Sequence, residues 1–182
     1  MTKLLATFLL LLSPTLAQAQ DFSGLYGGVS YGDARGTIDL PADTIYDIEG
    51  QAAGVFLGYN VQSGALVYGG ELAYQSGDIP MVVYSGARVD RIFDLKGRLG
   101  YALGSTLVYG VLGYSSNRLY AGDDYTTGGG VAFGLGVEYR VSDRFFVGAE
   151  YLRRKMHNDA SIFVQEGYPD VSTLTLRVGM SF

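Results

Sequence analysis

Eight charged side chains recur at alternate positions of otherwise apolar stretches, and ion pairing is the chemistry that they can perform. Four are acids and four are bases: Glu71, Asp94, Glu138, Glu150, Lys96, Arg98, Arg140 and Arg177. A buried charge without a partner is strongly destabilising, whereas balanced charges can neutralise one another. The equal numbers therefore predict an internal network of ion pairs.

A catalytic interpretation starts from His157, the single histidine, which has Asp159 and Ser161 nearby in KMHNDAS. A serine nucleophile needs a base within hydrogen-bond reach and a third group that orients the base. The spacing matches no hydrolase pattern, so a solvated loop histidine is preferred and no catalytic residue is expected. No cofactor is expected either, since GGGVAFGLG (128–136) opens a predicted strand and not the helix whose N-terminus would hold a phosphate.

Acidic residues gather in two segments that we expect to be loops. They are Asp33, Asp39, Asp43, Asp47, Glu49, Asp123 and Asp124. Carboxylates at this density can hold divalent cations, which also bridge the phosphates of lipopolysaccharide. Their spacing is not that of an EF-hand loop, so a solvated acidic rim is preferred and no dedicated metal site is predicted.

Residues 1–19 have the parts of a secretory signal peptide. Lys3 precedes an apolar run at 4–12, and Ala17 and Ala19 form a small-x-small cleavage pattern. The run is too short for a membrane helix, which needs about 20 apolar residues. We therefore expect these residues to be removed.

The mature domain is expected to comprise 20–182. Loss of the signal peptide, with one lysine and no acid, takes the formal net charge from −5 to −6. Nucleic-acid binding is disfavoured because it needs a basic surface. The chain has no cysteine, which excludes disulfides and a lipid anchor at the cleavage site.

Eight segments follow, most of them alternating apolar and polar residues with a period of two. They are 22–32, 52–62, 65–75, 89–103, 106–116, 131–141, 144–154 and 171–182. Three connections are tight turns (QSGA, LGST and VSDR), and they alternate with long gaps at 33–51, 76–88, 117–130 and 155–170. Segments of roughly ten residues in this arrangement predict an all-β, eight-stranded antiparallel up-and-down barrel that crosses an outer membrane.

The two faces of these segments indicate which side contacts lipid. One face has an aliphatic band with aromatic residues at both ends, as at the two interfaces of a bilayer. The band comprises Leu57, Leu72, Leu95, Leu99, Leu135, Val137, Val147, Leu176 and Val178. The aromatic residues are Tyr59, Tyr68, Tyr101, Tyr139, Phe145 and Phe182 at the short-turn end, and Tyr31, Tyr74, Phe93 and Tyr151 at the other. The charged face, with Asn60, Gln62 and Gln75, is then expected to line the lumen. Segment 106–116 is apolar on both faces, so its orientation stays open.

Five stretches taken in order carry a family resemblance. They are FSGLYGGVSYG (22–32), ELAYQSGD (71–78), DLKGRLGYAL (94–103), GVEYRVSDRFFVGAEYL (136–152) and TLRVGMSF (175–182). After a signal peptide, this series resembles the small outer-membrane barrels of the OmpA/OmpX type and the opacity-protein-like surface antigens of Gram-negative bacteria. The resemblance implies an outer-membrane location, both termini on the periplasmic side, and contact with outer-membrane lipid and lipopolysaccharide. It also implies that the barrel assembly machinery reads Phe182, although many relatives have an aromatic residue where this chain has Met180.

The expected function is a structural one: a monomeric, non-catalytic barrel that supports the envelope and presents a surface antigen. A narrow porin-like channel is the first alternative, because the predicted lumenal glycines Gly58, Gly100, Gly134, Gly136 and Gly148 leave space that water could fill. An adhesin that binds a host or neighbouring cell through its long loops is the second. A soluble ligand carrier is disfavoured because its interior should be apolar. No periplasmic domain is expected after Phe182.

Overall fold

The computed structural model describes residues 20–40, 44–80, 87–121, 124–157 and 169–182. The predicted signal peptide and its cleavage residues Ala17 and Ala19 lie outside the described residues. The same holds for Asp43, Asp123, Asp159 and Ser161. Among the residues that the structure describes, no helix is long and apolar enough to span a membrane.

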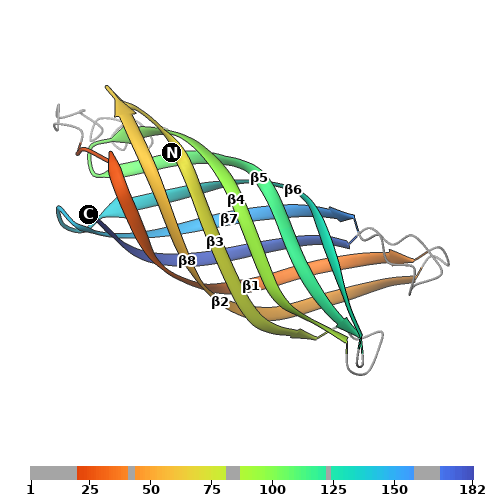
Figure 1. Ribbon diagram of the computed structural model, residues 1–182. Helices are drawn as coiled ribbons and strands as arrows, with labels where there is room; N and C mark the ends of the chain where they lie inside the picture. Colours follow the sequence, from red (N-terminus) through yellow and green to blue (C-terminus); the bar gives the residue numbers. More distant parts are fainter. Residues whose placement is uncertain (1–19, 41–43, 81–86, 122–123, 158–168) are drawn as a thin grey trace, which may run out of the picture.

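Eight antiparallel strands close into one barrel in sequence order, which confirms the predicted fold (Figure 1). They are β1 (Gly24–Leu40), β2 (Thr44–Ser63), β3 (Leu66–Pro80), β4 (Ala87–Leu103), β5 (Thr106–Ala121), β6 (Asp124–Arg140), β7 (Phe145–His157) and β8 (Pro169–Ser181). β1 pairs with β8 from Tyr26 opposite Ser181 to Ile38 opposite Pro169. This pairing closes the sheet, and a closed sheet makes internally the backbone hydrogen bonds that lipid cannot supply.

The strands continue well past the predicted segments at the long-gap end. β1 has 17 residues and β2 has 20, whereas about 9–11 residues cross a membrane. The predicted loop at 33–51 is therefore wrong over most of its length, since β1 and β2 stay paired up to Leu40 and Thr44. Ile38, Ile45 and Tyr46 supply the β-branched and aromatic residues that favour strands, despite the acids between them. Figure 1 shows the two strands extending beyond their neighbours.

Two of the three short turns depend on glycine. Gly64 joins β2 to β3 and Gly104 joins β4 to β5, with φ angles of 63° and 61°. This left-handed region is one that glycine adopts without strain. The third turn, between β6 and β7, is held instead by the Ser142 hydroxyl, which accepts a hydrogen bond from the Phe145 amide at 3.1 Å. The carboxyl terminus lies at this short-turn end of the barrel (Figure 1).

The predicted division of the two faces is confirmed. All of the predicted band and belt residues are exposed on the outside of the barrel. At the long-gap end, the next described outward position beyond each predicted belt aromatic residue is polar, for example Asp33 after Tyr31 and Arg153 after Tyr151. The open question on 106–116 is answered by the pairing of β5 with β4 and β6. Leu107, Tyr109 and Val111 point inward, while Val108, Leu112 and Tyr114 point outward.

Candidate functional site

Six charged side chains interlock at the centre of the lumen. Three are acids and three are bases, all 2–4% exposed: Glu71, Glu138, Glu150, Lys96, Arg98 and Arg177. Strand register sets their positions, because Glu71 on β3 lies opposite Lys96 on β4. Arg177 on β8 lies opposite Gly148 on β7, which lies opposite Glu138 on β6. We call these six side chains the central network.

Glu71 contacts all three bases of the central network. Its Oε1 atom forms an ion pair with Lys96 Nζ at 2.7 Å and accepts a hydrogen bond from Arg177 Nη1 at 3.0 Å. Its Oε2 atom accepts from Arg177 Nη2 at 2.6 Å and from Arg98 Nη1 at 3.1 Å. The Tyr26 hydroxyl donates to the same oxygen at 2.9 Å. One carboxylate on β3 therefore ties together side chains from β1, β4 and β8.

The other two carboxylates complete the pairing. Glu150 accepts from Lys96 Nζ at 2.6 Å and from Arg177 Nη1 at 2.7 Å. Glu138 accepts from Arg98 Nη2 at 2.8 Å. Each base thus contacts at least two carboxylates, and the charges within the network cancel. Such mutual pairing offsets the cost of removing charges from water. The charged groups of the central network are therefore paired with one another.

Aromatic rings pack around the arginines of the central network. The Arg98 guanidinium lies 5.0 Å from the ring centroid of Tyr26 and 3.9 Å from that of Tyr109. Arg177 lies 3.9 Å from the ring centroid of Phe56. These are cation–π distances, and they add to the ion pairs in a desolvated space. The Tyr109 hydroxyl also donates to Glu150 at 3.1 Å.

The space beside several lumenal glycines is filled by these side chains, and the expected room for water is not found there. A Cβ atom at Gly58 would overlap the phenol of Tyr26, and one at Gly136 would overlap the ring of Tyr109. A Cβ at Gly100 would lie 2.8 Å from the Tyr109 Cβ, and one at Gly148 would lie 3.0 Å from the Cγ of Glu138. Glycine is therefore used where a large lumenal neighbour occupies the space.

We expect the Gly136→Ala substitution to destabilise the barrel by about 1–3 kcal/mol, the usual cost of overpacking a filled interior. Tyr109, which lies opposite Gly136, is held by Glu150 and Arg98 and has little freedom to move away. The matched control is Gly110→Ala on the lipid-facing side, where the nearest atoms to a new Cβ lie 3.9 Å away. Urea unfolding in phospholipid vesicles measures the free energy of unfolding of both variants. An equal loss of stability in the two variants would contradict the filled lumen.

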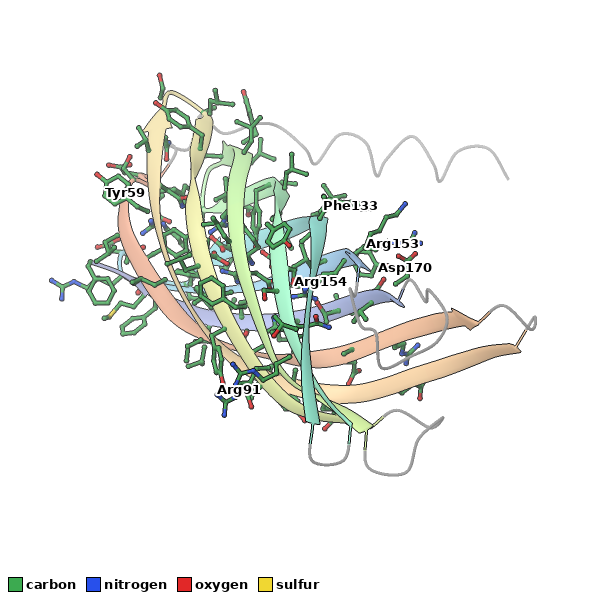
Figure 2. All side chains as sticks on the ribbon, turned by 45° about the vertical axis from the view of Figure 1, so that its right-hand side comes forward. Tyr59, Arg91, Phe133, Arg153, Arg154 and Asp170 are labelled. Atoms are coloured by element: carbon green, nitrogen blue, oxygen red, sulfur yellow. The ribbon has the colours of Figure 1, made fainter. Side chains whose placement is uncertain are left out.

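A second buried ion pair lies on the long-gap side of the central network. Arg154 donates through Nε and Nη2 to the two carboxylate oxygens of Asp94, at 3.0 and 2.7 Å. Its Nη1 atom donates to the Thr173 hydroxyl at 2.9 Å. Both charged side chains are fully buried, and Arg154 reaches across the lumen from β7 to β4. Figure 2 shows Arg154 inside the ribbon and Arg153, beside Asp170, outside it.

Sequence reasoning missed Arg154, although its position carried a signal. Arg154 follows Glu150 and Leu152 at two-residue intervals, so it has the same inward parity as Glu150. It lies at the end of the predicted segment 144–154, where an arginine pair looks like the start of a loop. The strand continues to His157, which keeps Arg154 inside the barrel.

Arg140 was expected in the ion-pair network and lies elsewhere. Its Nη1 atom donates to the Asp143 carbonyl at 2.9 Å, and its guanidinium lies 4.7 Å from the ring centroid of Phe22. It belongs to the short-turn end of the lumen, because it is the last residue of β6. Asp94, for its part, is bound by Arg154 and is not a member of the central network.

The segment before β1 covers this short-turn end. The Phe22 amide donates to the Gln62 side-chain oxygen at 2.7 Å, and the Gln20 amide donates to the Gly104 carbonyl at 3.2 Å in the β4–β5 turn. The Phe22 ring is buried in an apolar cluster with Val67, Ala102 and Leu107. Hydrogen bonds from Ser23 lower the pKa of Asp21 below its usual value. The short-turn mouth is thus closed by an apolar layer.

The other predicted site residues lie apart from the central network. Asn60 and Gln75 are buried in the lumen, and Gln62 is half-buried at the short-turn mouth. His157 ends β7 opposite Gly129 and is not in a loop. Phe182 is exposed, and its amide donates to the Leu25 carbonyl at 2.9 Å.

The predicted acidic segments do not form a cation site in the part of the chain that the structure describes. There, no group of three or more acids or histidines lies where it could hold a metal ion. Asp33 and Glu49 are exposed on β1 and β2, and Glu49 pairs with Arg35 at 3.9 Å.

The sequence matches the family described as outer membrane protein beta-barrel domain over residues 4–182. It is 29% identical over 174 residues to the 22 kDa outer membrane protein of Rhizobium leguminosarum bv. viciae, covering 88% of this chain and 74% of that protein. It is 26% identical over 211 residues to the 31 kDa outer-membrane immunogenic protein of Brucella melitensis biotype 1, covering 93% of this chain and 88% of that protein.

Solved structures of small barrels have a similar fold. Ail, the attachment invasion locus protein of Yersinia pestis, aligns with a TM-score of 0.55 and 15% identity over 87% of this chain and 99% of its own. Neisserial surface protein A aligns with a TM-score of 0.56 and 15% identity over 88% of this chain and 98% of its own. At this identity the likeness concerns the fold alone.

Proposed function

This chain belongs to the family of outer membrane protein beta-barrel domains, and on that basis we propose that it is a plugged, non-catalytic barrel with a structural and surface-presenting role. Its location is the outer membrane, as it is for the relatives that are named outer-membrane proteins. Within that location the barrel supports envelope integrity and holds its strand extensions at the cell surface.

The observation that carries this proposal is the filled lumen. An eight-stranded barrel has an interior just wide enough for side chains. Here three layers occupy it along the axis: the Phe22 cluster, the central network and the Asp94–Arg154 pair. A solute would have to separate paired charges in a low-dielectric space to pass, so the proposal favours a plug over the porin-like channel.

Surface presentation is supported by the length of the strands beyond the bilayer. β1 and β2 stay paired from Asp33 opposite Gln51 to Leu40 opposite Thr44, outside the aromatic belt. A rigid extended hairpin is a suitable scaffold for an exposed binding or antigenic surface. The Brucella melitensis relative is called immunogenic, which agrees with a surface antigen. An adhesin that acts through the same hairpin is the second candidate.

We expect refolded protein (20–182) to give no discrete current steps in a planar lipid bilayer, because an ion would have to separate the paired charges of the central network to pass. Heat-modifiable migration on a gel confirms folding before the measurement. Reproducible steps whose ion selectivity changes with the Lys96→Gln or Glu138→Gln substitution would overturn the plug and support a channel. Current steps whose ion selectivity is the same in the wild type and in both variants would come from bilayer defects and not from the lumen. A silent bilayer directs the search for a ligand to the surface of the hairpins.

A further inference from the structure

The four residues before β1 contact the barrel near all three of its short turns. The Gln20 amide donates to the Gly104 carbonyl in the β4–β5 turn at 3.2 Å. The Phe22 ring centroid lies 4.7 Å from the guanidinium of Arg140, the last residue of β6. The end of β2 supplies two further hydrogen bonds. We call residues 20–23 the strap, because they connect these turns across the mouth of the lumen.

Gln62 holds the strap at two points. Its side-chain oxygen accepts a hydrogen bond from the Phe22 amide at 2.7 Å, and its own amide donates to the Ser23 hydroxyl at 3.1 Å. The Gln62 Nε2 atom donates to the Gly64 carbonyl at 2.9 Å, which fixes the side chain against the β2–β3 turn. A single residue at the end of β2 therefore acts as the latch of the strap.

Gly24 connects the strap to β1. Its φ angle is 109°, in the left-handed region that favours glycine. The strap also has a turn of its own, since the Asp21 carboxylate accepts a hydrogen bond from the Ser23 amide at 2.8 Å. A rotation at Gly24 would move the strap as a unit and leave the pairing of β1 in place.

The seat of the strap is apolar and accounts for a feature that the ion pairs leave unexplained. The Phe22 ring is 4% exposed and packs in a cluster with Ala102 and Leu107, which lie opposite each other on β4 and β5. An inward-pointing leucine has no partner in a charged network, whereas it gives an aromatic ring a surface on which to pack. The apolar inner face of β5 is thus the seat of Phe22 at this end.

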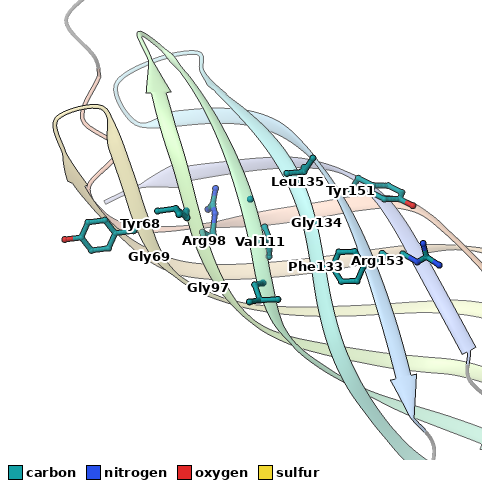
Figure 3. A pocket seen from close by; sticks show the side chains of 13 residues that line it. Tyr68, Gly69, Gly97, Arg98, Val111, Phe133, Gly134, Leu135, Tyr151 and Arg153 are labelled. Carbon is teal, nitrogen blue, oxygen red and sulfur yellow. The ribbon is translucent and has the colours of Figure 1, made fainter.

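The central network lies deeper in the lumen than the strap. Figure 3 shows its member Arg98 on β4, away from the short turn in which that strand ends. The strap is held by Gly104, Gln62 and Arg140, which are not members of the network. Release of the strap therefore breaks neutral hydrogen bonds and exposes one ring, whereas passage through the network would separate buried ion pairs.

Two polar atoms beside the strap are buried and make no hydrogen bond with any residue that the structure describes. They are Asn60 Oδ1 and Arg140 Nε. Both side chains are more than nine-tenths buried, and Asn60 lies opposite Gly24 at the base of the strap. A buried polar group usually has a partner, so this acceptor and this donor suit water or a small polar solute.

We propose that the strap is a lid on the periplasmic mouth of the lumen, hinged at Gly24 and latched by Gln62. Its release admits water and small polar solutes from the periplasm to the inner residues of the mouth. The short turns of such barrels face the periplasm, so the lid opens to that side. Local opening is expected where few contacts hold a segment. The lid operates separately from the central network and does not decide whether the lumen conducts.

The test is thiol labelling, because the chain has no cysteine of its own. Ala102→Cys places a reporter beneath the Phe22 ring, and Ser115→Cys places one opposite Asp94, beyond the central network. The refolded full mature chain (20–182) in detergent is treated with a small charged methanethiosulfonate, and intact mass follows the reaction. Heat-modifiable migration first verifies that every variant is folded.

We expect Gln62→Leu to raise the labelling rate at Ala102→Cys by about fivefold or more, the population change that loss of one buried hydrogen bond produces. The rate at Ser115→Cys should stay within twofold. Gln62→Glu keeps an oxygen for the Phe22 amide and should label more slowly than Gln62→Leu. The matched control is Gln51→Leu on the same strand, since Gln51 is exposed and binds the Tyr31 hydroxyl outside the lumen.

Three results would overturn the proposal. One is equal labelling of Ala102→Cys in the Gln62→Leu and Gln51→Leu variants, which would leave Gln62 without a role as a latch. Another is labelling of Ala102→Cys in the otherwise unchanged protein as fast as that of Ser63→Cys, at an exposed position, which would mean that the mouth is open. The third is an equal rise at Ala102→Cys and Ser115→Cys, which would show a general loosening of the lumen and no separate lid.

Discussion

Replacing Glu71 with glutamine should lower the free energy of unfolding of the barrel by about 3–5 kcal/mol, the usual result of removing one partner from a buried ion pair. Glu71 is 2% exposed, its carboxylate accepts hydrogen bonds from Arg98 and Arg177, and it forms an ion pair with Lys96. After the change, three buried cations share the two remaining carboxylates, Glu138 and Glu150. Urea titration of protein refolded in phospholipid vesicles measures the loss.

Two further variants separate charge imbalance from a general effect of the substitution. Glu49→Gln is the matched control, because Glu49 pairs with Arg35 while both side chains stay about three-quarters exposed, at 75% and 74%. Exposed pairs contribute about 0–1 kcal/mol, so this variant should unfold nearly as the wild type does. The double variant Glu71→Gln/Lys96→Met restores equal numbers of acids and bases and should recover part of the stability. Wild-type stability of Glu71→Gln alone would show that the network does not support the barrel.

The Arg154→Met substitution should be comparably harmful, with an expected loss of about 3–5 kcal/mol, because Asp94 would be left buried and without its cation. Arg154 supplies both hydrogen bonds to the two Asp94 oxygens and also binds Thr173. The adjacent residue offers a matched control: Arg153→Met changes the same residue type on the outer face, and its unfolding transition should coincide with that of the wild type.

The rescue variant is Asp94→Leu/Arg154→Met, which removes both charges and leaves apolar side chains in their place. Replacing a buried pair by apolar groups is often neutral or stabilising, so the double variant should be more stable than Arg154→Met alone. Equal losses for Arg153→Met and Arg154→Met would mean that the inward and outward assignment of β7 is wrong at this point.

The course of the strands through the membrane could be predicted because it depends on a local property. Successive side chains of a strand point to opposite faces, so Leu95, Lys96 and Leu99 in one short stretch already indicate which face meets lipid. The same logic failed beyond the bilayer, where lipid no longer imposes the alternation. Acids such as Asp39 and Asp47 look like loop residues there, yet β1 and β2 continue as a paired hairpin.

The partners inside the lumen could not be predicted in the same way. Arg177 and Glu71 are 106 residues apart in the sequence, and Arg154 and Asp94 are 60 apart. Their meeting depends on strand register and on which rotamers reach across the lumen. Arg140 and Arg154 both point inward, but they lie at different heights along the barrel axis. Arg140 contacts the Phe22 ring and the Asp143 carbonyl. Arg154 contacts Asp94.

The two-residue period of most of the segments already predicted the barrel, its lipid-facing band and the inward direction of seven charged side chains: Glu71, Asp94, Lys96, Arg98, Glu138, Glu150 and Arg177. The closed barrel was needed to show which of these charges meet, how β5 is oriented, and that Tyr26 and Tyr109 occupy the space beside Gly58 and Gly136. The physical reason is closure: the lumen is formed by all eight strands together, and its packing does not exist in any one of them.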